Sequence, residues 1–326
     1  MKEKITVAII GKSGQAAKIM EMLKEIPDVD LSYVYYPKLV KSSPLPLTNN
    51  FKKILAAKAI IIASPTDTHA SYLKRLQNHP GYIFVEKPAV STKQETEEFK
   101  KYPVAWRKRV KINFNFQYSE IAKILASLIN NPKFGQPIFF DVKTSHGLAF
   151  SDKYQNSWRS DASRSFGVLE LVGVHFINLT LNLFGPIKNF QADGLWKANQ
   201  GKKLPPDTVF LSLNMNKNMR VNLYHSYAGP AFNHLLLMGT NGYFEYDGKT
   251  VNIYSPRDSY DSSGLFVSPP IIKTYKIDWA IAWQKSLKYS LENFFSIVKQ
   301  KKDFPLTGLE TGLAAMEPIF YLKNRL

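Results

Sequence analysis

Cysteine is absent from the 326-residue chain. This absence excludes disulfides, thiolate metal ligands and cysteine catalysis, and it fits a reducing compartment. Long apolar runs are absent as well. The first run, residues 5–10, is too short to span a bilayer and leads into a glycine-rich turn instead of a signal-peptide cleavage site. We therefore expect a cytoplasmic protein with no membrane association and no bound metal.

Acidic residues are few compared with basic ones. The 43 lysines and arginines outnumber the 26 aspartates and glutamates, which gives a net charge of +17. The basic residues are spread along the chain, and their densest cluster, at 106–111, is best interpreted as a solvated loop before a strand. We therefore expect no nucleic-acid partner. Diffuse positive charge favours small anionic ligands such as dinucleotides, nucleotide sugars and uronic acids.

Two patterns of apolar residues divide the chain. Up to residue 112, strand segments alternate with helix segments, as in a doubly wound parallel sheet with helices on both faces. Beyond residue 113, several alternating strand segments follow one another, with turn signals at Asn241–Gly242 and Asp247–Gly248. A chain of this length has room for two cores. We expect an α/β Rossmann domain at 1–112 and an α+β domain with an antiparallel sheet at 113–326.

The first apolar strand runs directly into the sequence Gly11-Lys12-Ser13-Gly14-Gln15-Ala16. In the dinucleotide-binding pattern G-x-G-x-x-G/A, Gly11 takes the first place, Ser13 the second and Ala16 the third. Ser13 departs from the pattern, and its side chain would either bond a phosphate or crowd it. The start of the next helix, Gly14–Ala16, favours an anion. A plain turn is the alternative, but the place directly between an N-terminal strand and a helix favours a cofactor loop.

An acidic residue is missing from the end of the second predicted strand, where it would hold the ribose 2′-hydroxyl of NAD. The strand ends instead with Tyr35-Tyr36-Pro37-Lys38. A lysine without a carboxylate favours a 2′-phosphate. We therefore expect NADP slightly over NAD, with Tyr36 and Lys38 beside the cofactor. The alternative is a ribose held by backbone groups or water.

A buried strand pattern at 82–85 ends in Glu86-Lys87-Pro88. Burying two charges is costly unless they pair or act. Ligands of parallel sheets bind at the carboxyl ends of the strands, which is where Lys87 would lie. Lys87 is therefore placed where a bound ligand would lie. The alternative is a lysine at the rim, paired with Glu86.

Three segments together resemble the Gfo/Idh/MocA family of NAD(P)-dependent sugar oxidoreductases. The first contains the turn Ser64-Pro65-Thr66 and His69, the second contains Glu86-Lys87-Pro88, and the third contains Gly173-x-His175. They occur in the family's order. The resemblance implies a Rossmann domain followed by a domain with a large, mostly antiparallel sheet. It also implies homodimers or homotetramers that pack through this sheet.

The resemblance further implies roles for individual residues. Lys87 would exchange a proton with the substrate hydroxyl or carbonyl, and His175 would be a second acid/base or orienting group near the same oxygen. The substrate would be a sugar or nucleotide sugar. The cofactor would be bound by loop and strand-end residues, which are Gly11, Ser13, Gly14, Gln15, Ala16, Tyr36, Lys38, Ser64, Pro65, Thr66, His69, Glu86 and Lys87. The substrate would contact Asn115, Trp158, Arg159 and Asn178.

The sequence departs from the family pattern around His175. Leu171 stands where the family has an aspartate, and on an α-helix Glu170 would be rotated from that place by about 100°. Asn178 replaces a second aspartate, and Gln117 replaces an arginine. These departures, together with Ser13, motivate one alternative to a working oxidoreductase, which is a catalytically weakened NAD(P)-binding sensor or scaffold. The resemblance implies a second alternative, because the family also includes redox-assisted hydrolases or lyases that retain their cofactor.

Overall fold

The computed structural model describes residues 4–38, 44–198 and 204–325 and divides the chain into two compact units. The first unit comprises Met1–Phe114 and Lys288–Met316, and the second comprises Asn115–Leu287 and Glu317–Leu326. The long helix α9 (Trp279–Lys299) contributes to both. Lys288–Met316 packs with the first unit although it lies far along the chain; the backbone N–H of Phe304, for example, donates to Lys108 O at 2.7 Å. The domain boundary at residue 112 stays a prediction.

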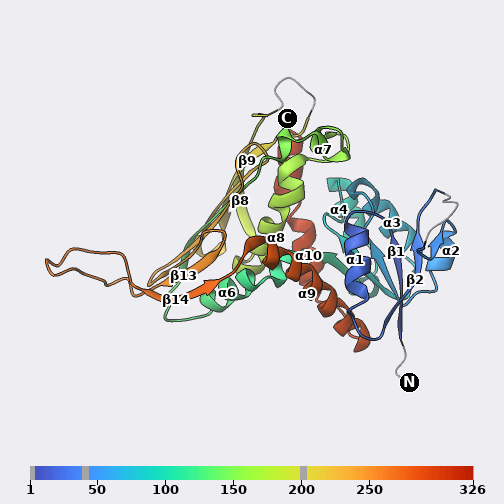
Figure 1. The fold of residues 1–326 in the computed structure, drawn as a ribbon, viewed down its shortest axis with the longest axis horizontal. Helices are drawn as coiled ribbons and strands as arrows, with labels where there is room; N and C mark the ends of the chain where they lie inside the picture. The colour runs from blue at the N-terminus through green and yellow to red at the C-terminus, as the bar shows by residue number, and fades with distance from the viewer. Residues whose placement is uncertain (1–3, 39–43, 199–203, 326) are drawn as a thin grey trace. The chain divides into compact units, whose positions relative to one another are not determined.

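A six-stranded parallel sheet forms the first unit (Figure 1). The strand order is β3-β2-β1-β4-β5-β6, so the direction of winding reverses between β1 and β4. Strands β1, β4 and β5 are buried along almost their whole length, as expected for a parallel sheet covered on both faces. The strands are β1 (Ile5–Ile10), β2 (Val29–Tyr35), β3 (Leu47–Thr48), β4 (Ala59–Ile62), β5 (Tyr82–Glu86) and β6 (Val110–Asn113). The helices are α1 (Gln15–Leu23), α2 (Phe51–Ile54), α3 (His69–Arg75), α4 (Lys93–Lys100), α5 (Val104–Arg107) and α10 (Leu306–Ala314), with the 3₁₀ turn η1 (Thr66–Thr68) before α3.

An eight-stranded sheet forms the second unit, in the order β14-β13-β12-β11-β7-β10-β9-β8. Its neighbouring strands are antiparallel except for β7 and β10, which are parallel. The fold class predicted from the sequence is therefore confirmed. The strands are β7 (Pro137–Ser145), β8 (Ile187–Leu195), β9 (Thr208–Met215), β10 (Arg220–Ser226), β11 (Phe232–Gly239), β12 (Tyr243–Tyr246), β13 (Thr250–Tyr254) and β14 (Ile271–Lys276). The helices are α6 (Glu120–Ile129), α7 (Asp152–Gln155), α8 (Val174–Phe184) and α11 (Glu317–Lys323), with 3₁₀ turns η2 (Asn115–Tyr118), η3 (Leu148–Phe150), η4 (Trp158–Ser160) and η6 (Asn216–Asn218).

A π-helical turn, η5 (Leu169–Gly173), precedes α8. Gly173 lies so close to β10 that a Cβ on it would be 2.8 Å from Cδ2 of His225. Because a π turn holds one residue more than an α turn, the rotation of 100° assumed between Glu170 and Leu171 does not apply here. Glu170 is buried, whereas Leu171 is partly exposed.

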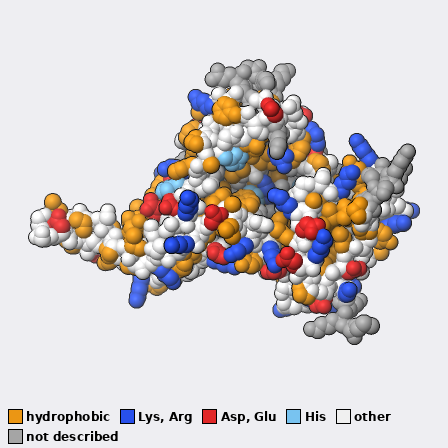
Figure 2. Space-filling view, in the orientation of Figure 1, with side chains coloured by type: hydrophobic (Ala, Val, Ile, Leu, Met, Phe, Trp, Pro, Cys, Tyr) orange, Lys and Arg blue, Asp and Glu red, His pale blue; other side chains and the backbone are white. Residues whose placement is uncertain are grey.

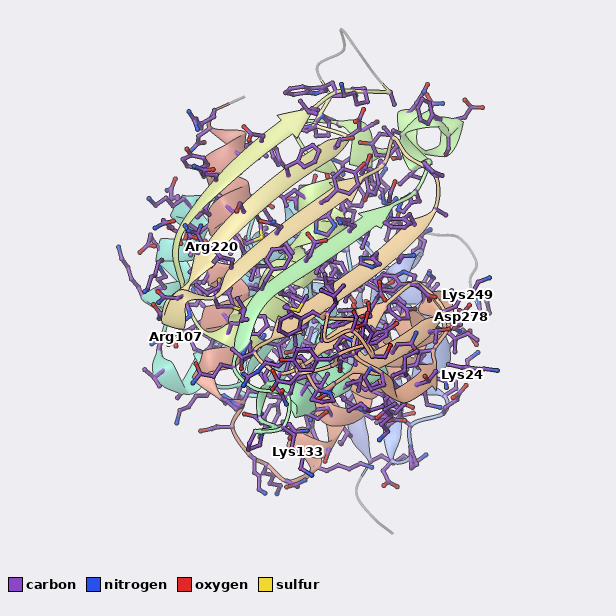
Figure 3. All side chains as sticks on the ribbon, turned by 90° about the vertical axis from the view of Figure 1, so that its left-hand side faces the viewer. Lys24, Arg107, Lys133, Arg220, Lys249 and Asp278 are labelled. Atoms are coloured by element: carbon purple, nitrogen blue, oxygen red, sulfur yellow. The ribbon has the colours of Figure 1, made fainter. Side chains whose placement is uncertain are left out.

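Helices cover one face of the eight-stranded sheet. Phe140 on β7 packs against Phe184 on α8 with ring centroids 5.7 Å apart. Figure 3 looks onto the opposite face, where no helix lies in front of β7–β10. On this open face, Phe210 and Phe232 are 46% and 47% exposed. The open face is thus an uncovered surface with apolar side chains.

The connection between β13 and β14, residues 255–270, extends away from the sheet as an orange loop in Figure 1 and a narrow projection in Figure 2. Tyr260 and Phe266 pair across it, with ring centroids 4.7 Å apart. Leu265 and Phe266 are largely exposed. Among the described helices, none is long and apolar enough to cross a membrane.

Candidate functional site

The turn after β1 begins with Gly11, at the carboxyl edge of the parallel sheet. Gly11 has a φ of 119°, and a Cβ on it would lie 2.7 Å from the carbonyl oxygen of Ala63 at the end of β4. Glycine alone satisfies both conditions. Gly14 has a φ of 60° and precedes α1 with no side-chain cap, so the first N–H groups of α1 suit an anion. The turn therefore fits the pyrophosphate of a dinucleotide.

Glu86 at the end of β5 accepts hydrogen bonds from two neighbouring elements. Its Oε1 accepts from Gln15 Nε2 at 3.1 Å and from Asn113 Nδ2, at the end of β6, at 2.8 Å. Asn113 Oδ1 in turn accepts from Ser290 Oγ on α9 at 2.7 Å. Burial raises the pKa of Glu86, while the hydrogen bonds from Asn113 and Gln15 and the charge of Lys87 lower it. The network joins the start of α1, which directly follows the Gly11–Gly14 turn, to β5, β6 and α9.

Lys87 follows directly and is partly buried, and its peptide bond to Pro88 is cis. The buried ring of His69 lies between this turn and the turn after β4. His69 Nδ1 is 2.8 Å from Pro88 O, and Nε2 is 2.9 Å from Ser64 O. The structure thus brings Ser64, His69 and Lys87 together at the ends of the neighbouring strands β4 and β5.

The end of β2 presents cationic and aromatic groups. The backbone N–H of Gly11 donates to Tyr35 O at 3.1 Å, which holds the cofactor turn beside β2. As a result, Lys12 Nζ lies 4.1 Å from the centre of the Tyr36 ring. Lys38 is exposed two residues further on. This edge of the first unit therefore carries positive charge.

His175 lies in the first turn of α8 in the second unit. It is 2% exposed, and its ring centroid is 4.9 Å from that of Trp283. Asn178 is also buried, and its Oδ1 accepts from Asn182 Nδ2 at 3.1 Å. Asn115 Nδ2 donates to Ser286 Oγ at 2.7 Å. The two asparagines are thus hydrogen-bonded within their own unit.

Trp158 and Arg159 form the turn η4. The Arg159 guanidinium lies 4.8 Å from the Trp158 ring and is exposed. The charge of this arginine affects the buried Tyr227. Burial and Tyr154 raise the pKa of Tyr227, Arg159 lowers this pKa, and Glu170 raises it. The carboxylate of Glu170 accepts from the backbone N–H of Phe166 at 2.9 Å. Arg159 and Glu170 thus act in opposite directions on the pKa of one buried phenol.

The predicted cofactor residues all belong to the first unit, whereas His175 and the predicted substrate residues belong to the second. Two residues beside the predicted cofactor residues, Lys12 and Asn113, were not among those predicted from the sequence. Asn113 could have been found, because it lies at the carboxyl end of a parallel strand, as Glu86 does. The position of Lys12 could not, because it depends on how the turn packs on β2. Within the described residues, no group of three or more histidine, aspartate or glutamate side chains could hold a metal ion.

Comparisons with known proteins identify both parts of the chain. Residues 5–114 match the model described as "Oxidoreductase family, NAD-binding Rossmann fold", and residues 126–320 match "Oxidoreductase family, C-terminal alpha/beta domain". Glucose-6-phosphate 3-dehydrogenase of Bacillus subtilis (strain 168) is 26% identical over 187 residues, which are 55% of this chain and 53% of that protein. The chain spans about half the length of the curated relatives it matches.

Solved structures share the fold over nearly the whole chain. A levoglucosan dehydrogenase in complex with NADH and levoglucosan superposes with a TM-score of 0.80 at 13% identity, covering 99% of this chain and 98% of that one. A myo-inositol dehydrogenase from Corynebacterium glutamicum ATCC 13032 has a TM-score of 0.74 at 16% identity, covering 98% and 95%. With both family models matched in order, the chain belongs to the Gfo/Idh/MocA family of oxidoreductases.

Proposed function

We propose that the protein transfers a hydride between a nicotinamide cofactor and a hydroxyl or carbonyl of a sugar or nucleotide sugar. The observation that carries this proposal is the position of Lys87. It follows β5 at the carboxyl edge of a Rossmann sheet, and the residue before it, Glu86, is hydrogen-bonded to Gln15 at the start of α1. When bound, the nicotinamide accepts or gives the hydride. Lys87 takes the proton from the substrate hydroxyl during oxidation and returns it during reduction.

Residues of the first unit would hold the cofactor. The backbone at Gly11, Ser13 and Gly14 and the start of α1 suit the phosphates. Pro65 and Thr66 would line the cofactor site, and Glu86 would stand beside the nicotinamide ribose. We propose NADP as the preferred form, because Lys12, Tyr36 and Lys38 gather at the end of β2, where a 2′-phosphate needs positive charge.

His175 would be a second acid/base or orienting group, and Asn115, Trp158, Arg159 and Asn178 would contact the sugar. The exposed Arg159 supports a phosphate or carboxylate on the substrate, because its guanidinium binds such groups with paired hydrogen bonds. The curated relative, a glucose-6-phosphate 3-dehydrogenase, makes sugar phosphates the first class to test.

We also propose a cytoplasmic homodimer or homotetramer assembled through the open face of the eight-stranded sheet. Its half-exposed Phe210 and Phe232 are apolar groups that a second copy would cover.

The proposed function is tested with glucose 6-phosphate, levoglucosan, myo-inositol and nucleotide sugars, each with NADP and NAD, by following the absorbance of reduced nicotinamide. Turnover of a sugar with either cofactor supports the proposal. Tight NADPH binding with no turnover on the panel would favour the sensor or scaffold suggested by Leu171, Asn178 and Gln117.

A further inference from the structure

His69 is buried at the junction of two turns that the proposed mechanism uses. Its ring is 1% exposed. Nδ1 lies 2.8 Å from the carbonyl oxygen of Pro88, and Nε2 lies 2.9 Å from the carbonyl oxygen of Ser64. Both ring nitrogens therefore face the backbone, and a direct bond from this ring to a cofactor would cost one of these contacts.

The two carbonyls belong to the turns that follow two different strands. Pro88 O follows Lys87 on the turn after β5. Ser64 O begins the turn after β4, which is held by its own hydrogen bonds: Ser64 Oγ lies 2.7 Å from Thr68 Oγ1, and Thr68 Oγ1 donates to Pro65 O at 2.7 Å. The Ser64–Thr68 turn is thus a fixed support to which the ring attaches the Lys87 turn.

We propose that His69 is a positioning residue for Lys87, whose turn it ties through Pro88 O to the Ser64–Thr68 turn. The inference rests on the proposed function, since it assigns the placement of the acid/base to a residue outside the reacting atoms. A misplacement of about 1 Å at a reacting group costs roughly 10²-fold in rate. Loss of the contact between His69 and Pro88 O, one residue after Lys87, should therefore have a measurable effect on the rate.

The protonation of the ring decides how many ties it makes. Carbonyl oxygens only accept, and a neutral imidazole has a single N–H, so it donates to one of the two carbonyls, whereas the imidazolium donates to both. Burial lowers the pKa of His69, the bonds to Pro88 and Ser64 and the charge of Asp67 raise it, and Lys87 lowers it. Asp67 on η1 and Lys87 itself are thus charged groups that act on the ring.

Variants of His69 separate the two ties. His69→Leu removes both. In His69→Asn, the side-chain amide takes the place of Nδ1 and keeps a donor toward Pro88 O. In His69→Gln, the longer side chain places its amide nearer Nε2 and keeps the donor toward Ser64 O. His79→Leu is the matched control, because His79 is buried in the same unit and neither of its ring nitrogens has a hydrogen-bond partner within the described part of the chain.

Turnover is measured with whichever of the sugars named under the proposed function the wild type oxidises. We expect His69→Leu to lose about tenfold or more of kcat, while the Kd for NADPH changes by less than about threefold, and His69→Asn to recover more of kcat than His69→Gln. The dependence of kcat on pH should also differ between the wild type and His69→Leu on the acidic side of the optimum. An unchanged kcat in His69→Leu, an equal loss in His79→Leu, or equal recovery by asparagine and glutamine would overturn the inference.

A second readout needs no substrate. The lysines are ¹³C-methylated reductively, and the Lys87 signal is assigned with Lys87→Arg. We expect this signal to shift in His69→Leu and to stay in place in His79→Leu; an unchanged signal would overturn the inference. If Lys87→Ala keeps full turnover, the proposed function fails, whereas a dependence on Lys87 without any effect of His69 sinks the positioning role alone. Should His69→Leu not fold, the asparagine and glutamine pair carries the comparison.

Discussion

At the scale of single residues, β5 and β6 carry buried polar side chains that are hydrogen-bonded, among them Glu86 and Lys111. Glu86 is bonded by Gln15 and Asn113, and Lys111 Nζ donates to Ser290 O at 2.9 Å and to Asn293 Oδ1 at 3.0 Å. Such pairing compensates part of the desolvation cost. The sequence indicated the polar strand end at Glu86 and Lys87, but it could not show Lys111, because its partners on α9 lie far along the chain.

Lys111 gives a prediction for the pH dependence of stability. Burial lowers the pKa of this lysine from 10.5 to about 7. Between these values the unfolded chain binds the proton and the folded chain does not, so stability rises with pH, by up to about 1.4 kcal/mol per pH unit. We expect urea unfolding to show this slope between about pH 7 and about pH 9 in the wild type, and Lys111→Met to lose it. The exposed Lys133→Met is the control; the same slope in Lys111→Met would contradict the assignment.

Lys12 gives a prediction for cofactor choice. If Lys12 meets the 2′-phosphate, then Lys12→Ala should weaken NADPH binding by about 10- to 100-fold, as expected for a lost charge-assisted hydrogen bond of about 1.5–3 kcal/mol. NADH binding should change little, because NADH lacks this phosphate. Fluorescence titration with both cofactors measures the ratio, and Lys18→Ala, an exposed lysine on α1, is the control. Equal losses for NADPH and NADH, or tighter binding of NADH by the wild type, would refute the preference for NADP.

At the scale of elements, the sequence predicted the parallel and antiparallel sheets because their periodicities and turn residues are local signals. It did not predict the π turn η5. At the end of that turn, Gly173 lies close to the ring of His225, which comes from a strand more than forty residues later and so leaves no local signal in the sequence. For the same reason, the placement of Glu170 could not be deduced from α-helical geometry.

Gly173 tests this packing. A Cβ on Gly173 would lie 2.7 Å from Leu169 Cδ1 and 2.8 Å from His225 Cδ2. We expect Gly173→Ala to lower the free energy of unfolding by about 1–3 kcal/mol through overpacking. The control is Gly308→Ala on α10, where nothing lies within 4 Å of the added carbon; this change should stabilise the protein by about 0.5–1 kcal/mol through helix propensity. Chemical denaturation measures both, and a stabilising Gly173→Ala would contradict the packing described.

At the scale of the whole molecule, a net charge of +17 opposes association of copies unless apolar surface offsets it. The open face of the eight-stranded sheet provides such surface at Phe210 and Phe232. The extension at 255–270 contains one arginine and two aspartates, so it carries a net charge of −1 and adds no repulsion.

The open face predicts the oligomeric state. We expect the wild type to form a dimer or tetramer in light scattering after size exclusion, and the double variant Phe210→Asp with Phe232→Asp to become a monomer, because two buried charges would be unpaired. Phe150→Asp is the control, since Phe150 is exposed on η3 outside the sheet. A monomeric wild type, or a double variant that stays assembled, would argue against this surface.

The proposed function depends most directly on Lys87, which would carry the proton in hydride transfer. The direct measurement is kcat of folded Lys87→Ala, with saturating cofactor and the panel sugar that the wild type oxidises, followed by the absorbance of reduced nicotinamide. We expect a loss of about 10²–10⁴-fold, the range of general acid–base catalysis, with the Kd for NADPH changed by less than about threefold. Turnover equal to that of the wild type would contradict it.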